Sequence, residues 1–230
     1  AKISERALKN DPENVYLSHA PRLKLKAEFV KDLVMASSGL MDSTLGGPSV
    51  KPYQPRGLWE QASSGRGELA TYKQDTGRAL YRRGMYTFIK LTVPPPAMMI
   101  FDASNRDQCE VKRLKTSTPL QALVMMNDPM VLEASRVLAQ QLLKIYPDDD
   151  TRLSNAFQRI ISRRPKPREL SIMAGYLSEQ RELLKKGTMD PVKVLQVGYY
   201  PQPAKSDAIE TAALMKTISA IYNLEEAITK

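Results

Sequence analysis

The sequence predicts a mainly α-helical protein whose second half is a helical bundle, packed with a long, irregular and partly extended segment from the first half. Three observations lead to this prediction. After residue 117, apolar residues recur at helical spacing between Pro and Asp residues that favour helix starts. From 41 to 76, clusters of Gly, Pro and Ser replace that spacing and favour turns. Of the 230 residues, 42% are apolar, which is enough for one sizeable core.

One helix is predicted in the first half of the chain. The opening twenty residues are polar and include the turn sequence DPEN. Further on, Ala27, Val30 and Val34 fall on one helical face, and Gly39 follows as a suitable C-cap. We therefore expect a helix over 26–38 that packs through this face.

The segment that follows the turn-rich region is harder to assign. Its apolar residues between 78 and 93 fit neither helical nor strand spacing, and Gly84 weakens a helix. Pro94, Pro95 and Pro96 then favour an extended chain. We interpret the apolar stretch 97–101 as a short buried strand.

The helical half begins with a predicted capping box. Thr118 precedes Pro119, and Gln121 lies three residues after the threonine. Asp128 and Pro129 form a second start signal, for a cap followed by proline in the first turn. The residues expected to be buried on these two helices are Leu120, Leu123, Val124, Val131, Ala134, Leu138, Leu142 and Ile145.

Three further helices are expected. A run of three aspartates, 148–150, favours a helix start through the helix dipole, and is more typical of capping than of calcium binding. The next helix opens at Pro167 and stops at Gly187. The last helix begins at Asp207, which forms another capping box with Glu210. Buried positions on the first of these helices are expected at Leu153, Ala156, Phe157, Ile160 and Ile161.

Charge and rare residues narrow the classes of function. Lys and Arg exceed Asp and Glu by 34 − 25 = 9, which favours anionic partners such as sulfated or carboxylated polysaccharide. Nucleic acid fits the charge, but the sequence has no nucleic-acid motif, so we expect no nucleic acid as a partner.

With one His and one Cys, the chain lacks a C-x-x-C-H haem site and the ligands for a Cys/His zinc site, so we expect no cofactor and no metal. No stretch approaches the roughly 20 apolar residues of a transmembrane helix.

The most specific motif runs from 101 to 129: FDASNRDQCEVKRLKTSTPLQALVMMNDP. It resembles the segment FDAPxRxxCxxRRxxTNTPLQALxLLNDP of the family catalogued as domain of unknown function 1553. LKAEFVKDLVMASSGLMDSTLGGPSVKPYQPRGLWE upstream and AFQRIISRRPKPREL downstream are also similar to that family. Lys112 and Ser117 stand where this pattern has Arg and Asn, and Lys115 stands where the family usually has Arg.

The resemblance implies a biological setting. Members form the C-terminal domain of large planctomycete-type bacterial proteins that often carry a c-type cytochrome domain elsewhere. This chain is then one domain over 1–230, with a loop-rich segment 41–116 and a helical segment 117–230, and is the C-terminal fragment of a longer protein. A periplasmic or extracellular location follows, with a role in binding or processing complex polysaccharides. The alternative is a structural module that docks on the preceding domain of the same protein.

Four residues are candidates for catalysis, although the sequence does not decide whether the chain is an enzyme. Asp102 with Arg106, and Asp128 with Thr116, are possible carboxylate networks of the kind that glycoside chemistry uses. Cys109 lies among cations that would lower a thiol pKa, but a free cysteine is more often a small buried apolar residue.

Five residues are candidates for substrate binding: Lys51, Trp59, Arg82, Arg83 and Arg113. Trp59 either pins the long loop to the core or offers a stacking platform for a sugar. Arg82 and Arg83 belong either to a solvated face or to the rim of an anion site. A pocket shared by 46–56, 81–83 and 101–116 would favour glycan binding, and an exposed apolar surface near the N-terminus would favour docking.

Overall fold

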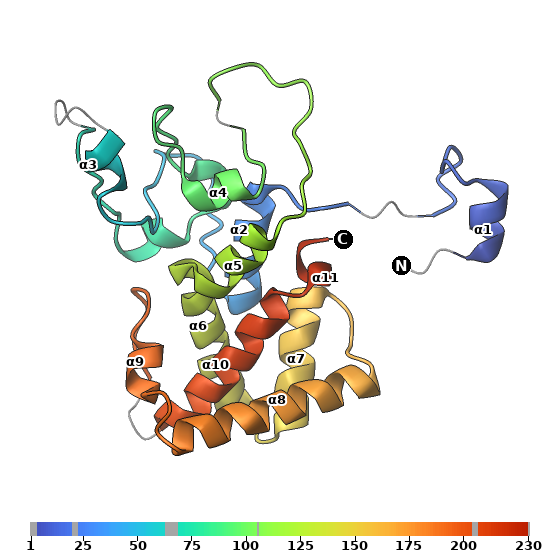
Figure 1. Ribbon diagram of the computed structural model, residues 1–230, viewed down its shortest axis with the longest axis vertical. Coiled ribbons are helices and arrows are strands. Elements are labelled where there is room, and N and C mark those ends of the chain that lie inside the picture. The colour runs from blue at the N-terminus through green and yellow to red at the C-terminus, as the bar shows by residue number, and fades with distance from the viewer. Residues whose placement is uncertain (1–3, 20–22, 63–68, 105, 204–206, 230) are drawn as a thin grey trace.

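Helices dominate the computed structural model, which describes residues 4–19, 23–62, 69–104, 106–203 and 207–229 (Figure 1). The mainly α class is therefore confirmed. Within those ranges β pairing is confined to isolated bridges, such as the antiparallel bridge between Lys24 and Thr229. None of the helices in the described parts of the chain is both long and apolar enough to cross a membrane.

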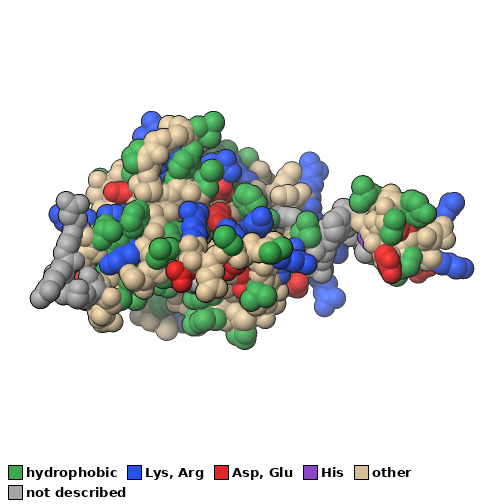
Figure 2. All heavy atoms as spheres, turned by 90° about the horizontal axis from the view of Figure 1, so that it is seen from above, with side chains coloured by type: hydrophobic (Ala, Val, Ile, Leu, Met, Phe, Trp, Pro, Cys, Tyr) green, Lys and Arg blue, Asp and Glu red, His purple; other side chains and the backbone are tan. Residues whose placement is uncertain are grey.

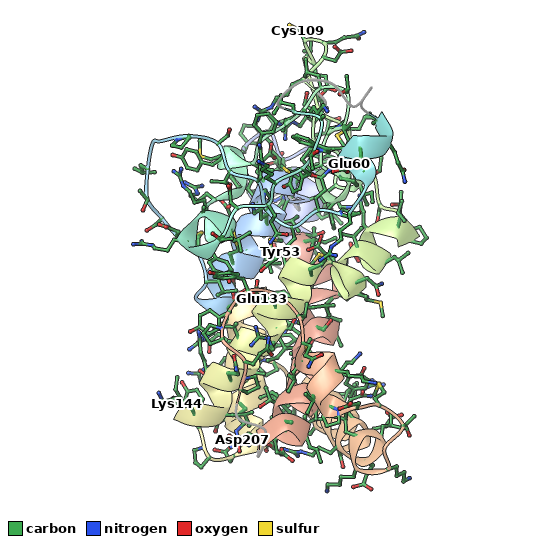
Figure 3. The ribbon with its side chains drawn as sticks, turned by 90° about the vertical axis from the view of Figure 1, so that its left-hand side faces the viewer. Tyr53, Glu60, Cys109, Glu133, Lys144 and Asp207 are labelled. Carbon is green, nitrogen blue, oxygen red and sulfur yellow. The ribbon has the colours of Figure 1, made fainter. Side chains whose placement is uncertain are left out.

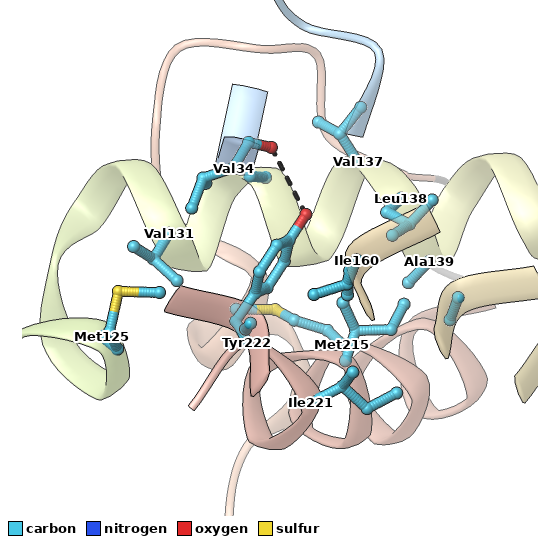
Figure 4. Close-up of a cluster of buried hydrophobic side chains, with 14 of the residues drawn as sticks. Val34, Met125, Val131, Val137, Leu138, Ala139, Ile160, Met215, Ile221 and Tyr222 are labelled. Atoms are coloured by element: carbon cyan, nitrogen blue, oxygen red, sulfur yellow. Dashed lines mark hydrogen bonds between the residues drawn. The ribbon is translucent and has the colours of Figure 1, made fainter. Parts of the chain in front are cut away.

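Four long helices of the second half form the main core. They are α6 (Pro129–Ile145), α7 (Asp149–Ile161), α8 (Pro167–Lys185) and α10 (Ala208–Tyr222). Helix α10 lies at the centre, packed against α6, α7 and α8, and α2 (Ala27–Ser38) joins the bundle through α6 and α7. Apolar side chains from α2, α6, α7 and α10 lie together in this core (Figure 4), and α8 adds Met173, Leu177 and Leu184.

One buried tyrosine joins the two halves of the chain. The Tyr222 hydroxyl lies 2.7 Å from the Ser37 hydroxyl and 3.3 Å from the Val34 carbonyl oxygen, both on α2 (Figure 4). Tyr222 itself is fully buried. Its polar group is thus satisfied inside the core, as burial requires.

The other helices of the described chain are short. They are α1 (Glu5–Asn10), α3 (Leu58–Ala62), η1 (Gly77–Tyr81), η2 (Gly84–Tyr86), α4 (Pro96–Ile100), α5 (Pro119–Asn127), α9 (Pro191–Leu195) and α11 (Glu225–Ile228). Helix α1 lies on an arm away from the body of the molecule and has no buried residue (Figure 1).

Several predicted helix boundaries are confirmed. The helix expected over 26–38 is present, and Gly39 ends it with a φ of 76°. Asp128 caps α6 by accepting from the Met130 N–H, and Asp148 caps α7 by accepting from the Thr151 N–H. Pro167 occupies the first turn of α8. These signals are local in sequence, which is why they can be recognised without the fold.

Other predictions were wrong. Residues 97–100 belong to helix α4 and Phe101 is its C-cap, so this stretch is not a strand; Pro96 fits the first turn of the helix. Thr118 makes no side-chain capping bond, and the Gln121 side chain donates to the Ile100 carbonyl at 2.8 Å. Asp207 likewise makes no capping bond at the start of α10.

The face of α5 was also assigned wrongly. Gln121 and Met125 face the core, whereas Leu120 and Leu123 are 50% and 55% exposed. On α6, Ile145 is exposed while the other predicted core positions are buried.

The irregular first half is held by buried polar side chains. The Arg82 guanidinium donates to the carbonyl oxygens of Thr44, Gly46 and Pro48, and it stacks 3.8 Å from the centre of the Tyr86 ring. Because Arg82 is only 8% exposed, these bonds fix the path of the 44–48 loop.

A buried carboxylate on α6 ties two distant loops to the bundle. Glu133 is fully buried and accepts from the hydroxyls of Tyr53 and Tyr81, at 2.9 and 3.0 Å, and from the Tyr200 N–H. Burial and the Glu133 charge raise the pKa of both tyrosines far above the ordinary value. Figure 3 shows Tyr53 beside Glu133 in the middle of the molecule. These three hydrogen bonds hold Tyr53, Tyr81 and Tyr200 against α6.

Candidate functional site

A polar hollow of about 430 Å³ lies between the chain at 24–26 and the loop that carries most of the 101–129 motif. It is lined by five cationic side chains, Lys24, Lys26, Lys112, Arg113 and Lys115, together with the carboxylates of Asp102 and Glu110. We call this site the basic hollow. Figure 2 shows Lys and Arg side chains gathered on the body of the molecule beside the arm that carries α1.

The motif loop is closed at its base by one carboxylate. Asp102 accepts from both the N–H and the hydroxyl of Thr116, each at 2.8 Å. Asp102 has a φ of 59°, a left-handed conformation that Asp tolerates better than most residues. The residues between Asp102 and Thr116 contain no helix or strand in the described part of the loop. The position of the loop therefore depends on the hydrogen bonds between Asp102 and Thr116.

Lys24 anchors the floor of the hollow. Its ammonium donates to the Thr116 carbonyl oxygen and, at 2.5 Å, to Oε1 of Gln121. Gln121 in turn donates through Nε2 to the Ile100 carbonyl oxygen. Both partners of Lys24 are neutral, so its positive charge is oriented but not cancelled.

Arg113 is the one cation of the hollow with an ion pair among the described residues. Its Nη1 donates to both carboxylate oxygens of Glu28 on α2, at 2.8 and 3.0 Å. Burial raises the pKa of Glu28, but the Arg113 hydrogen bond and charge outweigh it and hold the pKa below its ordinary value. The pair fixes the far side of the loop on the helical body.

The other lysines keep their charges available. Lys26, Lys112 and Lys115 are exposed, and none has a carboxylate at ion-pair distance in the described chain. Five cations against Asp102, Glu110 and Glu28 leave 5 − 3 = +2 at the hollow. A concave site with a net positive charge and mobile ammonium groups attracts anions and releases counterions on binding.

The two carboxylates predicted for catalysis are engaged in structural hydrogen bonds. Asp102 closes the loop, whereas Asp128 caps α6 and lines a different, apolar cavity. Thr116 is bonded to Asp102, so the predicted pairing of Asp128 with Thr116 was wrong. The described residues also contain no group of three His, Cys, Asp or Glu side chains that could hold a metal ion.

The two remaining catalytic candidates lie on the motif loop. Cys109 is exposed, so the interpretation as a small buried residue was wrong. Figure 3 places it at the end of the molecule, far from Glu133. Arg106 is exposed with a φ of 61°, and its N–H donates to the Ser104 hydroxyl. Arg106 and Asp102 form no ion pair in the described chain, contrary to the expectation from the sequence.

The substrate-binding candidates are dispersed. Trp59 is 1% exposed and packs against Tyr72 and Phe88, so it pins the loop and offers no free face to a sugar. The Lys51 ammonium lies 5.7 Å from the centre of the Trp59 ring. Arg113 is the only one of these candidates that lines the basic hollow.

The two arginines expected at a site rim lie elsewhere. Arg82 is buried among backbone carbonyls, which excludes it from a rim or a solvated face. Arg83 forms an ion pair with Asp32 of α2 at 3.0 Å. The basic hollow joins the motif loop to 24–26, and none of its described lining residues comes from 46–56 or 81–83, the segments whose shared pocket would favour glycan binding.

Lys24 and Lys26 were missed as site residues. A usable signal was present in the alternation K-L-K at 24–26, because residues two apart in an extended chain project to the same side. The bridge from Lys24 to Thr229 shows that this stretch is extended. The alternation does not reveal that the motif loop, some ninety residues later, lines the same hollow as Lys24 and Lys26.

Fold and hollow together define a mainly helical protein with a basic hollow built partly from a loop. Residues 1–177 match the family described as "PSD1: Protein of unknown function (DUF1553)", so the chain belongs to that family. No curated protein and no solved structure was found to match the chain.

Proposed function

We propose that this domain recognises anionic polysaccharide chains through the basic hollow. The single observation that carries the proposal is the convergence of five cations from two distant segments on one concave surface of about 430 Å³. Sulfate and carboxylate groups repeat along such polysaccharides, so several weak contacts add along one chain. The formal net charge of +9 supports the same class of partner.

The domain acts as a binding module in this proposal. Within the hollow, Asp102 is engaged with Thr116, and Glu110 is an exposed group beside Arg113. A glycosidase needs two carboxyl groups that face one sugar ring, one of them able to give up a proton. The arrangement therefore favours holding a polysaccharide over cleaving it.

The biological setting of the proposal comes from the family resemblance. We place the domain in an exported, periplasmic or extracellular protein that carries a c-type cytochrome elsewhere in its chain. The domain would then keep a polysaccharide substrate close to the other domains of that protein. Haem would belong to those domains, because this sequence has no C-x-x-C-H.

A panel of polysaccharides tests this function. Binding of the chain to a sulfated, a carboxylated and a neutral polysaccharide is measured by calorimetry across a series of salt concentrations. We expect binding to the two anionic polymers that weakens steeply as salt rises, because counterion release drives it. Equal binding to the neutral polymer, or no binding to any polymer at low salt, would reject the proposal.

A second candidate function is docking to another protein domain, and it rests on the exposed face of α5. Leu120, Leu123 and Met126 are 50%, 55% and 53% exposed and lie three residues apart. Val111 and Leu114 of the motif loop are also exposed, and so are Val15, Tyr16 and Leu17 on the N-terminal arm. Exposed apolar groups of this kind are typical of interaction surfaces.

Hydrogen exchange distinguishes docking from glycan binding. Exchange of residues 119–127 is compared between this chain alone and the longer protein that the resemblance implies. Docking predicts slower exchange of α5 in the longer protein. Unchanged exchange there would exclude α5 as the docking face, while leaving the polysaccharide panel to decide the first function.

A further inference from the structure

A second cavity, separate from the basic hollow, contains a buried amine. It measures about 70 Å³ and lies among α2, α4, α5 and the start of α6. Most of its wall is apolar, including Val30, Val34, Met98, Phe101, Val124 and Met125. The polar groups at this wall are the side chains of Lys31, Thr87 and Asp128 with the Tyr53 ring nearby.

Lys31 is buried in a way that is unusual for lysine. The residue is 6% exposed, and its ammonium donates to the Thr87 hydroxyl at 3.1 Å. In the described chain it has no other hydrogen bond and no carboxylate within ion-pair distance. An ammonium has three donors and a full charge, so two donors and the charge are left without a close partner. Burying a charge in this state is costly.

The nearby acidic groups are occupied by other bonds. Asp32 accepts from Arg83 and from the Gly84 N–H, while Asp128 accepts from the Met130 N–H at the α6 cap. Burial lowers the pKa of Lys31 to about 8 against the opposing attraction of these two charges. Burial also raises the pKa of Asp128. The cavity therefore has a cation that its own protein does not neutralise at close range.

We propose that this cavity binds a short-chain monocarboxylate, with the carboxylate on the Lys31 ammonium and the alkyl chain among the apolar side chains. The two free donors of Lys31 match the two oxygens of a carboxylate. The volume is about half that of engineered cavities of roughly 150 Å³ that take up benzene, which limits the alkyl chain to a few carbon atoms. This site does not depend on the polysaccharide proposal.

Titration calorimetry at pH 6.5 with acetate, and with ethanol as a neutral ligand of matched length, tests the proposal. Wild-type protein is expected to bind acetate at least tenfold more tightly than ethanol. Lys31→Met keeps the length and apolar character of the side chain without its charge, so it should lose the preference for acetate. Acetate binding no tighter than ethanol binding, or the same preference in Lys31→Met, would overturn the proposal.

Two controls separate binding from folding. Val124→Phe fills the cavity while Lys31 is retained, and it is expected to abolish binding of both ligands. In wild-type protein, NMR titration of the Lys31 side chain should show its pKa rising when acetate is bound, because a bound carboxylate favours the charged amine. An unchanged Lys31 pKa in saturating acetate would contradict the proposal without any variant.

Discussion

Asp102 holds Thr116 by two hydrogen bonds of 2.8 Å, one from the backbone N–H and one from the hydroxyl. These residues lie fourteen positions apart and close the base of the loop that builds one side of the basic hollow. The loop has no helix or strand in its described residues, so its shape depends on its ends. The positions of Lys112 and Lys115 on this loop therefore depend on Asp102, a carboxylate that the sequence offers as a catalytic candidate.

Asp102→Ala removes both bonds and places Ala in a left-handed conformation. We expect a loss of about 2 kcal/mol in the free energy of unfolding and faster hydrogen exchange over residues 106–115. Asp102→Asn is the matched control, because Asn tolerates this conformation and still accepts one bond. Its loss should be clearly smaller. Equal effects of the two substitutions in urea unfolding would show that the hydrogen bonds do not close the loop.

Arg82 should contribute far more to the free energy of unfolding than the nearby, exposed Arg78. Arg82→Ala is expected to cost about 3 kcal/mol, because three backbone carbonyls lose the same buried donor group. Arg78→Ala is the control: that side chain is 84% exposed and pairs with Asp42, so its loss should cost less than about 1 kcal/mol. Denaturant unfolding of both variants measures the difference, and similar midpoints would contradict this role of Arg82.

Gly198 is constrained by the buried carboxylate on α6. A Cβ at this position would lie 2.2 Å from Cδ of Glu133, and Gly198 has a φ of 77°. Gly198→Ala should therefore destabilise the protein by about 3 kcal/mol or more. Gly175 lies within α8 with nothing within 4 Å of an added Cβ, so Gly175→Ala should stabilise it by about 0.5–1 kcal/mol. Thermal unfolding measures whether each variant is less or more stable than wild type. A Gly198→Ala variant of unchanged stability would contradict the close packing of Gly198 against Glu133.

The pKa of Lys31 leads to a stability prediction at alkaline pH. Its pKa is about 8 in the folded protein, against an ordinary value of 10.5, so the folded state binds fewer protons between these pH values. Stability should therefore rise with pH in this window, by about 3 kcal/mol in total for this group. Lys31→Met should be more stable than wild type at pH 7, and this advantage should shrink from pH 8 to 10.5. A constant difference in urea unfolding would contradict the shift.

Local signals account for the parts of the fold that could be predicted. Asp128 before Pro129 and Pro167 at a helix start are recognisable because capping involves residues only a few positions apart. Gln121 was misassigned because its partners, Ile100 and Lys24, lie about twenty and almost one hundred positions away. No local pattern records such pairs.

The burial of Lys31 could have been predicted, although only weakly, from its position in the sequence. It lies between Ala27 and Val34 on the apolar face of the predicted helix, where a charged residue is unexpected. The sequence could thus have marked Lys31 as buried, but not the cavity, whose walls come from four elements. In the same way, composition predicted an anionic partner, while the hollow that would bind it required the fold.

The most direct test of the account compares two double variants in binding a sulfated polysaccharide. Lys112→Ala/Lys115→Ala removes two exposed charges from the hollow, and Lys144→Ala/Lys186→Ala removes two exposed charges away from it. Figure 3 shows Lys144 at the opposite end of the molecule from Cys109. Calorimetry at low salt should show at least tenfold weaker binding for the hollow variant and near wild-type affinity for the control. Equal weakening of both would show that net charge alone attracts the polymer, and would contradict a binding site in the basic hollow.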